Sequence, residues 1–142
     1  IEIDLDTKTM SWHAPILATA SEYTCLCLSP EGLLYGIVDR ERFFVYDVER
    51  RCVLAEHATG DTLGRSAYHQ GPRLFITIPE TGDVLVLFER AIARVCEGPH
   101  YRLEQVSEPP IPIQCGGDLH EGRIYFGSGS HLYSYDMEGS ST

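Results

Sequence analysis

Apolar residues in this chain recur at every second position or form short unbroken runs, and polar turns separate one run from the next. Alternation is typical of a β-strand with one buried face, and a short apolar run is typical of a strand buried on both faces. The best helical candidate, Ala91–Val95, is short and follows the strand register. The pattern therefore predicts an all-β fold.

The predicted strands group into three copies of a longer unit. The first copy has strands at Tyr23–Leu28, Leu33–Val38, Phe43–Val48 and Cys52–His57. The second has Arg65–His69, Arg73–Ile78, Val84–Phe88 and Ala91–Cys96. The third has Ile113–Leu119, Arg123–Gly127 and Leu132–Met137, and it lacks a fourth strand. The extra stretch at 98–112 is expected to be a long loop or an added strand.

The copies share marks that follow from strand and turn chemistry. A glycine precedes the expected second strand of each copy, at Gly32, Gly71 and Gly122. Glycine permits the positive φ of a tight turn. An aspartate ends the expected third strand, where it can accept backbone N–H bonds in the next turn. Asp47 and Asp136 hold this place, and Asp4 takes it when the N-terminus is aligned on the same pattern. Aromatic residues on the strands are expected to fill the space between stacked sheets.

Four-stranded repeats of about 40–50 residues are typical of β-propeller blades. The stretch from Gly122 to Asp136, GRIYFGSGSHLYSYD, resembles the quinoprotein-like (PQQ-type) blade. Residues 4–12, DLDTKTMSW, are similar to the end of such a blade, including its tryptophan, which the middle copies lack. A kelch-like propeller is the second choice, although its Gly-Gly pair is absent. A WD40 propeller is disfavoured because no Trp-Asp dipeptide occurs.

The resemblance implies a single β-propeller segment of four-stranded antiparallel blades, about three blades plus a partial one. The expected parts are the end of a blade at 1–18, blades at 19–60 and 61–110, and a blade without its last strand at 111–142. Such a set is an incomplete ring, because propellers need roughly four to eight blades. We therefore expect the partner to be the rest of its own propeller in a longer chain. A second copy that completes a ring of about seven blades is the alternative, which a stable monomer in solution would exclude.

Charge and cysteine content narrow the partners. The chain has 11 Lys and Arg against 21 Asp and Glu, a net charge of −10, which disfavours binding to nucleic acid phosphates. No apolar run is long enough to span a bilayer. The chain opens at Ile1 inside strand-like sequence, so the true N-terminus is expected to be missing, and no signal peptide is visible that would assign a cellular compartment. The five cysteines, without a C-x-x-C, are interpreted as small buried residues of a reduced protein and slightly favour a reducing compartment.

Ligand sites of propellers form where inter-blade loops and the starts of the innermost strands meet the central channel. The candidate ligand-binding residues at these places are Glu22, Tyr23, Arg42, Asp61, Arg65, Gln114, Asp118 and His131. Arg40, Glu80 and Asp83 are expected in neighbouring turns. Solvated loops and caps would explain the same residue types. His69 and His120 are expected in turns on the opposite rim, and no histidine spacing indicates a metal site.

The sequence carries no catalytic constellation of its own. Gly127–Ser130 is interpreted as a turn and not as a nucleophile elbow, because no helix follows it. No cofactor is evident. We expect a binding or scaffold module with a polar-ligand site, which takes a protein or a carbohydrate. The alternative is a lactonase-, lyase- or quinoprotein-dehydrogenase-like enzyme acting on a carbohydrate or another polar small molecule, and the residues lean against it for this chain alone.

Overall fold

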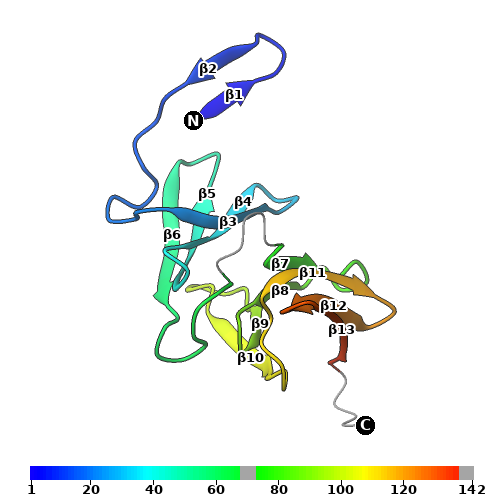
Figure 1. The fold of residues 1–142 in the computed structure, drawn as a ribbon. Coiled ribbons are helices and arrows are strands. Elements are labelled where there is room, and N and C mark those ends of the chain that lie inside the picture. Colours follow the sequence, from blue (N-terminus) through cyan, green and yellow to red (C-terminus); the bar gives the residue numbers. More distant parts are fainter. Residues whose placement is uncertain (68–72, 138–142) are drawn as a thin grey trace.

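The computed structural model describes residues 1–67 and 73–137 and is all-β (Figure 1). Thirteen strands in this part of the chain form four antiparallel sheets, and no helix occurs there. The prediction of an all-β fold is confirmed.

Three of the sheets are meanders in which each strand pairs with its neighbour in sequence. The first sheet holds β3 (Tyr23–Leu28), β4 (Leu33–Val38), β5 (Arg42–Asp47) and β6 (Cys52–Ala58). The second holds β7 (Phe75–Thr77), β8 (Val84–Leu87), β9 (Ile92–Val95) and β10 (Leu103–Ser107). The third holds β11 (Cys115–His120), β12 (Arg123–Ser128) and β13 (His131–Asp136). The N-terminal hairpin consists of β1 (Glu2–Asp4) and β2 (Thr9–Ser11).

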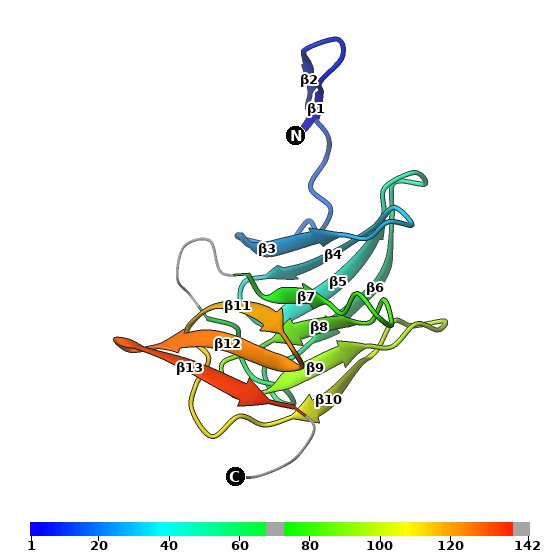
Figure 2. The same ribbon diagram turned by 90° about the vertical axis from the view of Figure 1, so that its right-hand side faces the viewer.

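The three meanders follow one another as propeller-like blades, and the N-terminal hairpin stands apart from them (Figure 2). The first strands of the sheets meet, because β7 contacts both β3 and β11. The described sheets do not close a ring. We call the end of the stack at which β3, β7 and β11 begin the first rim, and the end at which they finish the opposite rim.

The core lies in two layers between the sheets. Tyr35, Phe43 and Val45 of the first sheet pack against Val84 and Val86 of the second sheet and their neighbours. Their neighbours on the other face of β8, Leu85 and Leu87, pack against residues of the third sheet such as Ile124 and Phe126. Successive residues of β8 therefore point into different core layers, which explains why the sequence of this strand is an unbroken apolar run.

The turn marks predicted from the sequence are confirmed at two glycines and two aspartates. Gly32 and Gly122 have φ of +84° and +76°, whereas Gly71 lies outside the described residues. Asp47 Oδ1 accepts a hydrogen bond from Arg50 N at 2.9 Å. Asp4 Oδ1 likewise accepts bonds from the backbone N–H groups of residues 6 and 7 at 2.9 and 3.0 Å. The aromatic prediction also holds, since Tyr35 and Phe43 stack between the first two sheets.

The strand assignment of the second copy is wrong by one strand. The described part of the expected first strand, 65–67, is not a strand; Tyr68 and His69 lie outside the described residues. Ser66 N instead donates to Arg40 O at 2.8 Å, in a turn of the first sheet. The segment expected as a second strand forms β7, the first strand of its sheet, and the extra stretch supplies β10 as the fourth.

The cysteines are more exposed than the sequence predicts. Cys52 and Cys115 are exposed and the other three are half-buried, so none of the five is the fully buried residue that we expected, although all are free thiols. On the N-terminal hairpin, the register pairs Ile3 with Met10, and both side chains are exposed. Within the described residues, no helix is long and apolar enough to cross a membrane.

Candidate functional site

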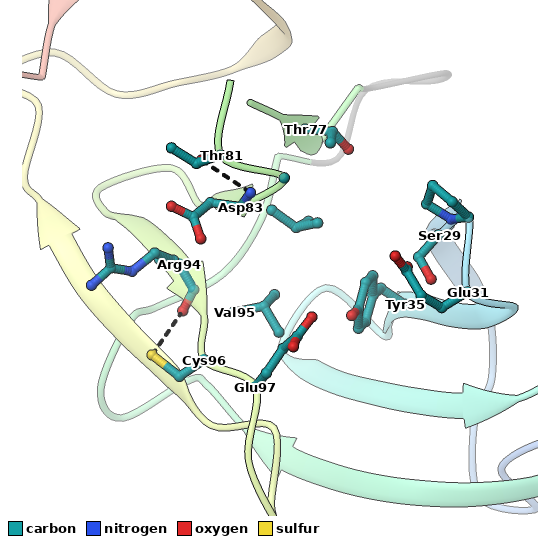
Figure 3. Close-up of a pocket in the computed structure, with 13 residues that line it drawn as sticks. Ser29, Glu31, Tyr35, Thr77, Thr81, Asp83, Arg94, Val95, Cys96 and Glu97 are labelled. Atoms are coloured by element: carbon teal, nitrogen blue, oxygen red, sulfur yellow. Dashed lines mark hydrogen bonds between the residues drawn. The ribbon is translucent and has the colours of Figure 1, made fainter. Parts of the chain in front are cut away.

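A pocket of about 350 Å³ opens on the opposite rim between the first and second sheets (Figure 3). One wall comes from the first sheet, with the β3–β4 turn at residues 29–31 and Tyr35 of β4. The other wall comes from the second sheet, with residues 77, 81–84 and 94–97. We call this cavity the rim pocket. It exists because the stacking of two sheets brings their turns together at this rim.

Tyr35 lies in the rim pocket at the end of the core layer. The residue is only 3% exposed, and its ring stacks on Phe43 with the centroids 6.2 Å apart. Among the described residues, the Tyr35 hydroxyl has no hydrogen-bond partner. Burial, with the nearby Glu97 carboxylate as the next cause, raises the pKa of Tyr35 to about 12. The hydroxyl is therefore neutral and available to a ligand at neutral pH.

Three carboxylates line the rim pocket, and all of them come from turns or strand ends. Glu31 belongs to the β3–β4 turn, Asp83 directly precedes β8, and Glu97 follows β9. Figure 3 shows Glu31 and Glu97 reaching from opposite walls toward Tyr35. Both glutamates also raise the pKa of the Tyr35 phenol, because a phenolate would lie near their negative charges.

The single guanidinium of the rim pocket belongs to Arg94, and it is already paired. Its Nη2 donates to Glu104 Oε2 at 3.0 Å, and this bond raises the pKa of Arg94. The same bond, followed by one from the Cys96 thiol at 3.4 Å, lowers the pKa of Glu104. In Figure 3 the Arg94 side chain extends away from Tyr35. The pocket thus presents carboxylates that no internal cation neutralises fully.

None of the eight residues predicted from the sequence lines the rim pocket. Those of the first sheet and the following loop pair with the protein itself. Arg42 binds Asp39 at 2.7 Å and Glu56 at 3.1 Å, and Arg65 Nε donates to Glu41 at 2.8 Å. The Tyr23 hydroxyl accepts a bond from Ile16 N at 3.2 Å.

Glu22 and Asp61 are exposed at the first rim. The carboxylate of Asp39 joins Arg42 to the Glu22 backbone, because its Oδ1 accepts the Glu22 N–H at 3.0 Å. Together with Arg65, these residues belong to the turns of the first sheet and the loop that follows it.

The remaining three candidates belong to the third sheet and its approach. Gln114 Oε1 accepts Gly129 N at 2.7 Å and so caps the turn in front of His131. Asp118 lies 3.8 Å from the Arg73 guanidinium, with both side chains largely exposed. The structure brings Gln114 and His131 to the same turn. A ligand site at the first rim stays a prediction.

The rim pocket was not predicted from the sequence. Glu80 and Asp83 were expected in a turn that neighbours the candidate ligand-binding residues, but their turn lies on the opposite rim, next to the β3–β4 turn. This correction follows from the one-strand error in the second copy. An alignment of the repeats that took the polar turn at 79–83 as the connection between the first and second strands, with Val84–Phe88 as the second strand, would have placed this turn on the opposite rim.

No protein-family model matches the chain, and no curated protein matches it. Among the described residues, no group of three His, Cys, Asp or Glu side chains could hold a metal ion.

Proposed function

We propose that this chain is a binding module built from β-propeller blades of the quinoprotein-like type, and that it holds a polar ligand in the rim pocket. Three successive sheets with strands in meander order support the propeller assignment. The hydroxyl of Tyr35 is the accessible end of an otherwise buried side chain, and its place beside carboxylates in an open cavity is the observation that carries the binding role. A few polar groups that converge on a cavity with apolar walls mark a place for a ligand.

The experiment is a titration of the ¹⁵N-labelled chain followed by NMR. The probes are N-acetylglucosamine, inorganic phosphate and Nα-acetyl-lysine methylamide, which represent a neutral sugar, an anion and a cation. We expect at least one probe to shift the amide resonances of Thr81, Gly82 and Val95, which line the pocket. If no probe shifts these resonances up to tens of millimolar, the proposed function is refuted.

A pair of matched variants localises the binding. Thr77→Trp places an indole at a lining position of the pocket, and it is expected to abolish the shifts. Thr62→Trp makes the same change at an exposed position of the first rim and is expected to leave them intact. Equal effects of the two variants would contradict binding in the rim pocket.

A further inference from the structure

We infer that the rim pocket selects an organic cation, namely an ammonium group carried on a short aliphatic stem. The ligand would be a lysine side chain of a partner or a free aliphatic amine, since both present the same group. This inference rests on the proposed function, because it names the chemical class of ligand for the same pocket.

The charge of the pocket favours a cation. Glu31, Asp83 and Glu97 contribute three carboxylates to its lining, and Arg94 contributes the only guanidinium. That guanidinium is engaged by Glu104, which does not line the pocket, and it also interacts electrostatically with Asp83. The lining still carries a net negative charge, so it would attract an ammonium group and repel phosphate or a carboxylate.

Tyr35 supplies a neutral acceptor at the same place. Its side chain is almost fully buried, its hydroxyl has no partner among the described residues, and Figure 3 shows Glu31 and Glu97 on either side of it. An ammonium group has three N–H donors and no acceptor. One donor to the Tyr35 oxygen and the others to the two glutamates would satisfy both the ligand and the pocket.

The walls of the pocket suit an aliphatic stem. Val84, Val95 and the ring of Tyr35 are buried residues that line the cavity. Methylene groups can pack along such apolar surface while the charged head stays with the carboxylates. A sugar would leave the carboxylates without a counter-charge, so the combination of walls and charges favours the amine.

The test measures affinities by NMR titration at low and high salt. Nα-acetyl-lysine methylamide and putrescine are the cationic probes, and they represent the two sources of the amine. The Nε-acetylated form of the lysine probe keeps the stem and loses the charge. We expect both amines, or one of them, to bind at the pocket amides, the Nε-acetylated form to bind at least tenfold more weakly, and added salt to weaken binding of the amines.

Four variants resolve the contacts. Glu31→Gln and Glu97→Gln should each weaken amine binding about fivefold, since each removes one charge from a partly solvated site. Tyr35→Phe keeps the ring and its stacking on Phe43, and it should weaken binding about threefold or more. Glu49→Gln removes the same charge at an exposed position that does not line the pocket, so it should leave the affinity unchanged.

Four results would overturn the inference. Equal binding of the Nε-acetylated probe would show that charge is not recognised, and equal effects of Glu49→Gln and Glu97→Gln would show that only net charge matters. Binding of N-acetylglucosamine or phosphate at the pocket amides without any amine binding would overturn the cation assignment and leave the proposed function standing. If no probe shifts the pocket amides, both proposals fall.

Discussion

A close contact within the first sheet lies where Gly36 of β4 faces Phe44 of β5 in register. Phe44 is completely buried, and its ring covers the glycine so closely that a Cβ at position 36 would fall far inside van der Waals contact with the ring. The same Cβ would also lie 3.0 Å from Leu26 Cδ2. The substitution Gly36→Ala therefore tests whether the face of this sheet is as tightly packed as the structure describes.

The expected loss of stability follows from these contacts. The ring would have to retreat by roughly an ångström, because carbon atoms pack at about 3.5–4.0 Å. Phe44 is also held edge-on by Tyr23, with the ring centroids 6.1 Å apart, so a simple rotation gives no relief. Overpacking of this kind costs about 1–3 kcal/mol, and we expect the upper half of that range. For a chain of this size, each kcal/mol lowers Tm by about 3 °C.

Urea unfolding followed by far-UV circular dichroism measures the change. Phe44→Leu alone should cost about 1–2 kcal/mol, because it leaves a small cavity. Adding it to Gly36→Ala should cost at least about 1 kcal/mol less than the two single losses together, since the smaller side chain makes room for the methyl group. Gly60→Ala is the control, because its nearest neighbour would be the flexible end of Glu41 at 3.1 Å, and its stability should stay within about 0.5 kcal/mol of the parent. Unchanged stability of Gly36→Ala, or strict additivity with Phe44→Leu, would refute the reasoning.

Three further predictions concern solvent exposure and titration. Trp12, the single tryptophan of the chain, is 75% exposed, so its fluorescence should be red-shifted and readily quenched by acrylamide in the folded protein; a blue-shifted, protected spectrum would show that a second copy or another segment covers it. The hydrogen bond from Arg42, followed by one from a backbone N–H, lowers the pKa of Asp39. The carboxylate therefore contributes its full stabilisation above about pH 4, the ordinary pKa of an aspartate, and this contribution is lost as the pH falls through the lower pKa of the folded state. Asp39→Asn should therefore flatten the decline of Tm in acid, and an unchanged profile would contradict the pairing. Cys52 is exposed whereas burial raises the pKa of Cys27, so peptide mapping after brief reaction with a thiol reagent should find Cys52 modified before Cys27, and the reverse order would contradict this difference in exposure.

Much of the strand content could be predicted from the sequence. The bounds of β3 and β4 were predicted to the residue, because each is an apolar or alternating run closed by a turn with Gly32 or Asp39. The period of about 40–50 residues also led to the blade-like sheets. Local pattern suffices for such strands, since their neighbours in the sheet are also their neighbours in sequence.

The strand at 65–69 was mispredicted over its described residues because alternation alone cannot show where a backbone finds its hydrogen bonds. Ser66 N donates to Arg40 O, and Arg40 Nε donates back to Ser66 O at 2.9 Å. These hydrogen bonds hold the segment against a turn of the first sheet, so its described residues do not pair with the strands of the second sheet. The rim pocket could not be predicted for a related reason. Glu31 and Glu97 flank strands of different sheets, and they line one cavity only because the two sheets stack.

The meander order has a consequence for how the chain acquires its structure. Every strand pair in the described sheets is formed by segments adjacent in sequence, so each sheet can form with short loop closures and a correspondingly small entropic barrier. The second sheet is apolar on both faces, and it gains its stability only when the sheets on either side are present. The stack therefore behaves as a one-dimensional array with nearest-neighbour coupling. During synthesis the first sheet leaves the ribosome before the second. Its apolar face with Tyr35, Phe43 and Val45 therefore stays exposed to solvent until the second sheet covers it.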